Sequence, residues 1–262
     1  MHPMLNIAIQ AARSAGKIIV RFLDHLDAND ITEKERHDFV TKVDRMAEEE
    51  IINTIQRSYP SHNILAEESG LRSGTTNCTW IIDPLDGTIN FIHGFPHFCV
   101  SIAFQRNDKL EVGVIYDPLR QELFTAVRGM GAQLNNRKIR VSPCKKLDNA
   151  LLGTGFPSRI EKHIQFYLKT LGVILPQTVG VRRAGSAALD IAYVAAGRLD
   201  GFWEMGLKSW DIAAGAVILM EAGGIISDFQ GGMGYFKSGE VVAATPKLHK
   251  PLVDIIQSAT RE

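Results

Sequence analysis

The stretch Trp80-Ile81-Ile82-Asp83-Pro84-Leu85-Asp86-Gly87-Thr88 places two carboxylates three positions apart at the end of an apolar run. The run favours a buried strand, and Pro84 predicts its end because proline cannot donate to a strand ladder. Asp83 is then expected at the carboxyl end of the strand and Asp86 on the following turn, where Gly87 permits a left-handed backbone. Both carboxylates can therefore face one point.

Two anions held this close repel each other unless a cation, a basic side chain or backbone donors compensate them. No Lys or Arg lies between Trp80 and Gly94. Hard carboxylate oxygens suit Mg²⁺, which takes one or two protein carboxylates together with waters and phosphate oxygens. The stretch therefore indicates a divalent-cation site, and the alternative at this point is an ordinary Asp-Pro turn followed by a helix cap.

Further acids stand at the ends of other predicted elements. Glu67 and Glu68 follow the short apolar run 63–66, which is typical of a strand end. Asp211 opens a helical pattern that runs to Ala222, so helix capping alone is an alternative explanation for it. Asp44 lies in a predicted helix over 41–59, and the acids 48–50 of this helix are interpreted as a solvated face. Helical periodicity alone therefore predicts a structural role for Asp44 rather than a catalytic one.

These motifs together resemble the inositol monophosphatase family in order and spacing. The residues that carry the resemblance are Ala66-Glu67-Glu68-Ser69, the stretch 83–91, Trp210-Asp211-Ile212-Ala213-Ala214-Gly215 and Glu221-Ala222-Gly223-Gly224. It extends from Asp38-Phe39-Val40-Thr41 through 183–188 to Gly231-Gly232, and the opening residues 1–8 resemble the bacterial inositol-1-monophosphatase branch. Ile89 departs from the family pattern, which commonly has a second Thr there.

The resemblance implies an α+β fold, a layered α-β-α-β-α sandwich of the inositol monophosphatase and fructose-1,6-bisphosphatase type. It implies a Mg²⁺-dependent hydrolase that releases phosphate from myo-inositol 1-phosphate and related sugar or polyol monophosphates. Two to three Mg²⁺ ions per active site and inhibition by Li⁺ are part of this expectation. A metal-activated water would attack phosphorus directly, without a covalent phosphoenzyme.

The resemblance also implies a role for individual residues. The expected metal ligands are Glu67, Asp83, Asp86, Asp211 and the backbone carbonyl of Leu85. Asp44 and Thr88, with Glu67, are the expected catalytic residues, which revises the structural interpretation of Asp44. The expected substrate contacts are Gly87, Thr88, Gly185, Ser186, Ala187, Glu204 and Asp211.

Two other functions stay open. The metal motifs are shared with relatives that act on fructose 1,6-bisphosphate or on 3′-phosphoadenosine nucleotides, so the substrate is not decided by them. The resemblance to the bacterial branch also implies a non-catalytic alternative, a role in transcription antitermination and ribosomal RNA maturation with RNA polymerase and Nus factors. A homodimer is expected, with Arg183 near the subunit contact.

Composition excludes several other classes. The chain of 262 residues has 29 basic and 29 acidic side chains, so a global field that attracts nucleic acid is absent. The basic clusters 182–183 and 137–140 are interpreted as solvated surface charge. Cys78, Cys99 and Cys144 form no Cys-x-x-Cys pair, and no apolar stretch reaches the length of a membrane span. A cytoplasmic protein without a membrane segment or a nucleotide-binding loop is predicted.

The chain is predicted to form two subdomains, 1–145 with most metal ligands and 146–262 completing the active site. A helix over 3–26, a mobile polar segment over 24–38, a hairpin over 98–105 and 110–116, and a strand over 122–127 are expected in the first. Helices over 164–171 and 186–196 and strands over 179–182 and 199–204 are expected in the second. His93 and His97 are left out of the catalytic set, since two His in a turn are more often solvated or hydrogen-bonded.

Overall fold

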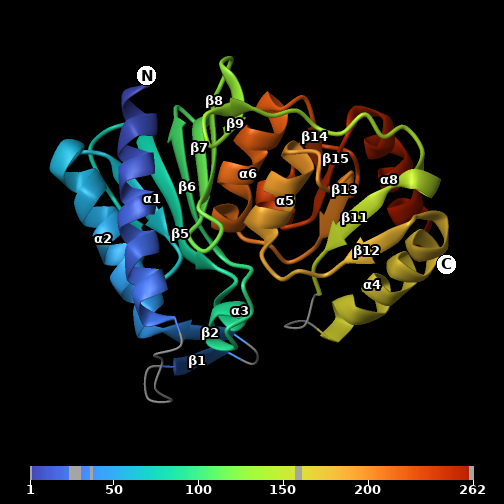
Figure 1. The fold of residues 1–262 in the computed structure, drawn as a ribbon, viewed down its shortest axis with the longest axis horizontal. Coiled ribbons are helices and arrows are strands. Elements are labelled where there is room, and N and C mark those ends of the chain that lie inside the picture. The colour runs from blue at the N-terminus through green and yellow to red at the C-terminus, as the bar shows by residue number, and fades with distance from the viewer. Residues whose placement is uncertain (1, 24–30, 36–37, 157–160, 260–262) are drawn as a thin grey trace.

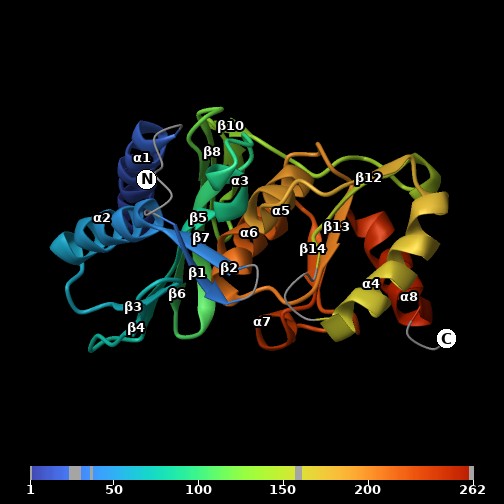
Figure 2. The same cartoon turned by 90° about the horizontal axis from the view of Figure 1, so that it is seen from below.

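The computed structural model describes residues 2–23, 31–35, 38–156 and 161–259. Within these ranges the elements form five layers, helices and sheets in alternation, as Figures 1 and 2 show from two directions. The α+β sandwich is the expected fold. Among the described residues, no helix is both long enough and apolar enough to cross a membrane. The three cysteines are free thiols.

The first sheet has eight strands in the order β10-β9-β8-β7-β6-β5-β3-β4. It is antiparallel except for the parallel pair β3 and β5. The strands are β3 (Asn63–Ala66), β4 (Gly70–Arg72), β5 (Cys78–Asp86), β6 (Cys99–Arg106), β7 (Lys109–Asp117), β8 (Glu122–Val127), β9 (Gly131–Leu134) and β10 (Arg137–Lys138). The predicted hairpin is confirmed, and its turn residues Asn107 and Asp108 both have positive φ.

Two helices, α1 (Pro3–Phe22) and α2 (Lys42–Ser58), cover the outer face of this sheet. Buried residues of α1 such as Ala8, Ala12 and Ala15 recur every three or four positions, which makes one apolar face. The helix ends at Phe22, earlier than predicted. A hairpin of β1 (Ile31–Glu35) and β2 (Asp38–Thr41) forms in the segment predicted to be mobile, and the remainder of that segment lies outside the described residues.

The second sheet has five strands in the order β12-β11-β13-β15-β14. The strands are β11 (Leu151–Thr154), β12 (Gly180–Arg182), β13 (Gly201–Glu204), β14 (Ile225–Ser227) and β15 (Val241–Ala244). On its outer side lie α4 (Glu161–Ile174) and α8 (Pro246–Ala259). Short helices η2 (Leu147–Asn149), η3 (Leu175–Gln177) and α7 (Tyr235–Ser238) complete this half.

Between the sheets lie α5 (Ala187–Ala195) and α6 (Ser209–Glu221), which are apolar on almost every side. One continuous core joins Ile81 and Phe124 of the first sheet to Val217 of α6 and Ala243 of the second sheet. The core therefore crosses residue 145, where the sequence predicts a subdomain boundary, and that division stays a prediction. Phe91, Phe202 and Trp203 are buried in the core.

Candidate metal and phosphate site

The strand β5 does not stop at Pro84, as the sequence predicted, but continues to Asp86. Asp83 pairs with Ser101 and Asp86 with Cys99, so β5 has one residue more than β6 between these pairs. This is a β-bulge, and Pro84 is tolerated because the ladder is interrupted there. The bulge sets both carboxylates at one end of the strand, and the Leu85 N–H donates to Asp83 Oδ1 at 3.0 Å.

Gly87 turns the chain from this strand into the short helix α3 (Thr88–Ile92), as expected. Its φ is +98°, and a Cβ at this position would lie 2.9 Å from the backbone oxygen of His97. Only glycine therefore fits without movement of the backbone. The turn brings the side chain of Thr88 back over the bulge, where its hydroxyl lies 3.0 Å from the carbonyl oxygen of Leu85.

Thr88 also donates its hydroxyl to Oδ1 of Asp44 at 2.9 Å, which joins α3 to the start of α2. Asp44 is fully buried, and its Oδ2 accepts from the Thr41 N–H at 2.8 Å and the Thr41 hydroxyl at 2.6 Å. Burial raises the pKa of Asp44, and the hydrogen bonds with Thr41 and Thr88 oppose that rise. The residue therefore caps α2 and also orients Thr88, so its structural and functional interpretations are both compatible with the geometry.

Four carboxylates gather beside this pair. Burial raises the pKa of Asp83 well above its ordinary value, and the nearby Glu67, Asp86 and Asp211 raise it further. Glu67 follows β3 and is held to β5 by its backbone N–H, which donates to Ile82 at 3.1 Å. Asp211 lies in the first turn of α6 and accepts from the Lys208 N–H at 2.7 Å.

A divalent cation fits this donor set. The carboxylates are hard oxygen ligands, and their mutual repulsion is the electrostatic condition that a bound cation relieves. Among the described residues, no three His, Cys, Asp or Glu side chains already converge as a formed metal site.

The sequence predicts a solvated face for the acids at 48–50, and Glu49 is exposed, but Glu48 contradicts the prediction. Glu48 is only 3% exposed, and its carboxylate accepts from the N–H groups of Glu68 at 2.8 Å and Ser69 at 2.9 Å. It therefore holds the turn that carries Glu67. Helical periodicity contained the signal, because Glu48 is four positions after Asp44 and on the face of the buried Ile51 and Ile55.

A second wall of the site comes from α5. Ser186 caps this helix, and its hydroxyl donates to Oδ2 of Asp86 at 2.6 Å, while the Ala188 N–H donates to the same oxygen at 2.8 Å. These donors oppose the rise in the pKa of Asp86 that burial causes. The predicted substrate contact Ser186 is thus engaged with an expected metal ligand. Gly185 precedes it with φ of +94°, and Ala187 is buried at the first turn.

Glu204 ends β13 and faces the same region. Burial raises its pKa well above the ordinary value, and Asp190, Asp211 and Asp86 raise it further, while Arg183 opposes the rise. A Cβ on Gly155 would lie 1.9 Å from the carboxyl carbon of Glu204, so this carboxyl rests directly on the backbone of residue 155.

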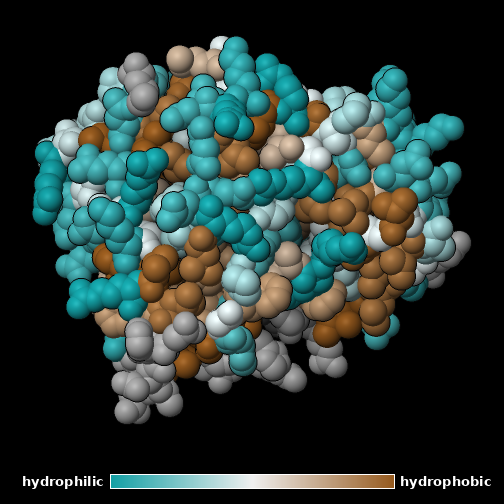
Figure 3. Space-filling view, in the orientation of Figure 1, coloured by the Kyte–Doolittle hydropathy of each residue, from teal (hydrophilic) through white to brown (hydrophobic). Residues whose placement is uncertain are grey.

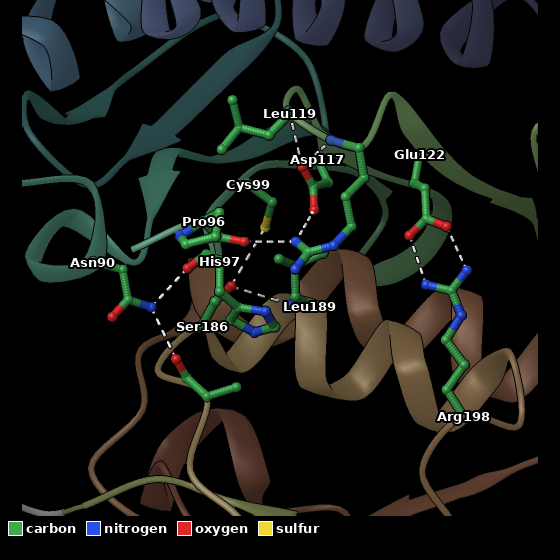
Figure 4. A network of polar contacts seen from close by, with 12 residues as sticks. Asn90, Pro96, His97, Cys99, Asp117, Leu119, Glu122, Ser186, Leu189 and Arg198 are labelled. Atoms are coloured by element: carbon green, nitrogen blue, oxygen red, sulfur yellow. Dashed lines mark hydrogen bonds and ion pairs between the residues drawn. The ribbon is translucent and has the colours of Figure 1, made fainter. Parts of the chain in front are cut away.

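Sequence reasoning missed the residues that join the two walls. Asn90 is 8% exposed and donates its side-chain N–H groups to the backbone oxygens of His97 at 2.7 Å and Ala184 at 2.9 Å (Figure 4). His97 is 5% exposed, and its Nε2 lies 3.7 Å from Oδ1 of Asp190. Burial raises the pKa of Asp190 to about 6, and His97 opposes this rise. No local pattern marks the contacts of Asn90 with Ala184 and of His97 with Asp190, because these partners are about 90 residues apart.

Comparison with known proteins identifies the family. The model of the inositol monophosphatase family matches residues 1–261. A Pseudomonas aeruginosa protein named Nus factor SuhB is 52% identical over 262 residues, which cover 98% of this chain and 97% of that protein.

Two solved structures share the fold. The extragenic suppressor protein suhB from Bartonella henselae is 40% identical with a TM-score of 0.94, covering 98% of this chain and 99% of its own. An inositol monophosphatase from Anabaena is 38% identical with a TM-score of 0.87, covering 97% of this chain and 95% of its own. The comparisons cover almost the whole chain and include the elements that carry the acidic site. This chain therefore belongs to the inositol monophosphatase family, a family of phosphatases.

Proposed function

We propose that this protein is a Mg²⁺-dependent phosphomonoesterase that hydrolyses inositol 1-phosphate and related sugar or polyol monophosphates. The observation that carries the proposal is the cluster of Glu67, Asp83, Asp86 and Asp211 beside the bonded pair Asp44 and Thr88. Repulsion within the cluster favours cation binding, and the neighbouring pair supplies a group that can orient water. Inhibition by Li⁺ belongs to the same proposal.

Each residue of the cluster would have a separate role in the reaction. Glu67, Asp83, Asp86, Asp211 and the Leu85 carbonyl would hold two to three Mg²⁺ ions, which supply charge neutralisation and water activation when bound. Asp44 would accept from the Thr88 hydroxyl, so that the hydroxyl oxygen stays free to accept from the attacking water, with Glu67 on its other side. Gly87 and Thr88 would direct backbone N–H groups at the phosphate.

The second wall would receive the alcohol part of the substrate. Gly185, Ala187 and Glu204 are the proposed contacts to ring hydroxyls, and Asp211 would contribute from α6. Ser186 would act chiefly by holding Asp86, since its hydroxyl already donates to that carboxylate. Fructose 1,6-bisphosphate and 3′-phosphoadenosine nucleotides stay open as alternative substrates, because this wall rather than the metal cluster would discriminate among them.

The direct test is phosphate release from inositol 1-phosphate, fructose 1,6-bisphosphate and 3′-phosphoadenosine 5′-phosphate, each with and without Mg²⁺. We expect Mg²⁺-dependent release chiefly from inositol 1-phosphate, and its loss in Asp83→Asn. Strong preference for either other substrate would reassign the substrate class. Absence of release from all three at saturating Mg²⁺ would refute the phosphatase proposal.

A second candidate function rests on the name of the 52% identical relative, a Nus factor. We propose that this protein also takes part in a transcription antitermination assembly with RNA polymerase and Nus factors, which would place it in the cytoplasm. The test is complementation of a strain that lacks the protein by Asp83→Asn, checked for normal folding by circular dichroism. Full complementation would separate the binding role from catalysis, and failure to complement would tie the phenotype to phosphatase activity.

A homodimer is part of the proposal. Leu168, Leu175 and Val179 are each at least half exposed on α4, η3 and the approach to β12, and Figure 3 shows brown side chains gathered over this part of the molecule. An apolar patch of this kind favours coverage by a second copy. Size-exclusion chromatography with light scattering should give twice the chain mass of 28.9 kDa, and a monomer at micromolar concentration would contradict this.

A further inference from the structure

A groove of about 780 Å³ lies between α1 and the turns at one end of the first sheet. One wall is the exposed side of α1, and the other is formed by the chain after β7 and by the turn between β9 and β10. None of its lining residues belongs to the metal and phosphate site. The groove is therefore a separate feature from the metal and phosphate site.

Three cations stand in line along the helical wall. Arg13, Lys17 and Arg21 are exposed residues of α1 that line the groove at intervals of four positions. Side chains four positions apart lie on the same helix face, about 6 Å further along the axis at each step. The positive charges therefore form a row with a regular spacing, which suits a ligand whose negative charges also repeat along a chain.

No partner among the described residues neutralises this row of cations. Within the described ranges, none of these three side chains forms an ion pair, although Arg21 lies over the ring of Phe22. The groove lining contains no Asp or Glu. The zero net charge thus conceals a separation between a basic groove and an acidic active site.

The facing wall offers an aromatic ring and amide groups. Tyr116 is half-buried and packs on the helix, since a Cβ at Gly16 would lie 2.6 Å from its ring. Asn135 holds the turn by accepting from the Leu123 N–H at 2.9 Å. Asn136 follows it in the left-handed conformation with φ of 65°, and is succeeded by the exposed cations Arg137 and Lys138.

We infer that this groove binds the phosphodiester backbone of a single-stranded nucleic acid. A basic groove with an adjacent aromatic side chain is the combination that proteins use for single strands, where cations contact phosphates and a ring stacks on a base. Three regularly spaced cations match the successive phosphates of such a strand. An acidic peptide would not require the ring of Tyr116 or the side-chain amides of Asn135 and Asn136. The sequence clusters at 137–140 and 182–183 did not reveal the groove, because its cations are dispersed along a helix.

The test is fluorescence anisotropy of a labelled single-stranded RNA oligonucleotide with the full-length protein over a range of salt concentrations. For three phosphate contacts, the logarithm of the binding constant should fall with the logarithm of salt concentration with a slope of about −2. The triple variant Arg13→Glu/Lys17→Glu/Arg21→Glu should bind at least about tenfold more weakly. The circular-dichroism spectrum and the thermal unfolding midpoint should be unchanged in this variant, which checks its folding independently of any phosphatase activity.

The matched control is Arg57→Glu/Lys247→Glu/Lys250→Glu, which makes the same charge change at exposed positions of α2 and α8. It should bind RNA as the wild type does. Tyr116→Leu should weaken binding about tenfold while Tyr116→Phe retains it, because the ring and not the hydroxyl stacks. Equal loss in both triple variants would show non-specific attraction and overturn the inference. Binding of poly-glutamate in place of RNA, abolished by the α1 changes, would assign the groove to an acidic protein instead.

Discussion

The acidic cluster at the end of β5 and the wall built by α5 and β13 differ in how their residues are distributed along the chain. Asp83, Asp86 and Thr88 belong to one local stretch whose geometry a bulge and a glycine determine. Ser186 and Glu204 come about 100 residues later and meet that stretch only in the folded protein. The difference teaches that a short stretch of sequence can reveal the ligands of a metal site. The groups that orient those ligands and shift their pKa values can lie far away in the sequence.

The largest effect on turnover should come from a change in the acidic cluster at the end of β5. Asp83→Asn removes a charge at the centre of the cluster, and we expect turnover with inositol 1-phosphate to fall about a thousandfold or more, since metal-ion stabilisation contributes several kcal/mol. Without Mg²⁺ the same variant should unfold at a higher temperature than the wild type, because a buried repulsive charge is gone. Near wild-type turnover at saturating Mg²⁺ would refute the metal assignment.

Asp190 of α5 should make the free energy of unfolding depend on pH. The pKa of Asp190 is raised from 3.8 to about 6, so the folded protein keeps a proton that the unfolded chain loses between these values. The stabilising contribution is complete below pH 3.8 and is lost as pH rises through about 6, a change of about 3 kcal/mol. In EDTA, urea denaturation of Asp190→Asn should lack this fall, and an unchanged pH profile would contradict the shift.

The bridge between the two halves should matter for stability. Asn90→Ala leaves the backbone oxygens of His97 and Ala184 without their donor, and we expect a loss of about 2 kcal/mol in the free energy of unfolding. Asn53→Ala on the exposed face of α2 is the matched control and should change stability by about 0.5 kcal/mol or less. Denaturant titration measures both, and equal effects would show that the bridge contributes nothing.

The contact behind Glu204 should affect substrate affinity. Gly155→Ala forces the carboxyl of Glu204 to move, so KM for inositol 1-phosphate should rise, with a stability loss of about 1 to 3 kcal/mol. Gly172→Ala is the control, since a Cβ there meets no atom within 4 Å and the residue lies in α4. If KM stays constant while stability falls, Glu204 does not contact the substrate.

Local patterns predicted most elements of the fold. Apolar residues at helical spacing predicted α1, and two apolar runs on either side of Asn107-Asp108 predicted the hairpin of β6 and β7. The errors arose where a local rule was applied without its exceptions. Pro84 was expected to end β5, but a bulge accommodates it. Glu48 was expected in solvent because charged helix residues usually are, but two backbone N–H groups stabilise it in the interior. The hairpin of β1 and β2 was missed because its strands are short and polar.

The sequence by itself determined the acidic stretch, the glycine that turns it and the order of motifs that marks the family. These are short-range features, set by covalent geometry and by residue type. Only the tertiary structure decided that Ser186 holds Asp86, that Asn90 ties α3 to the loop before α5, and that three cations of α1 share a groove with Tyr116. Each of these requires segments distant in sequence to pack together, and packing is selected by burial of the common core, which no local window contains.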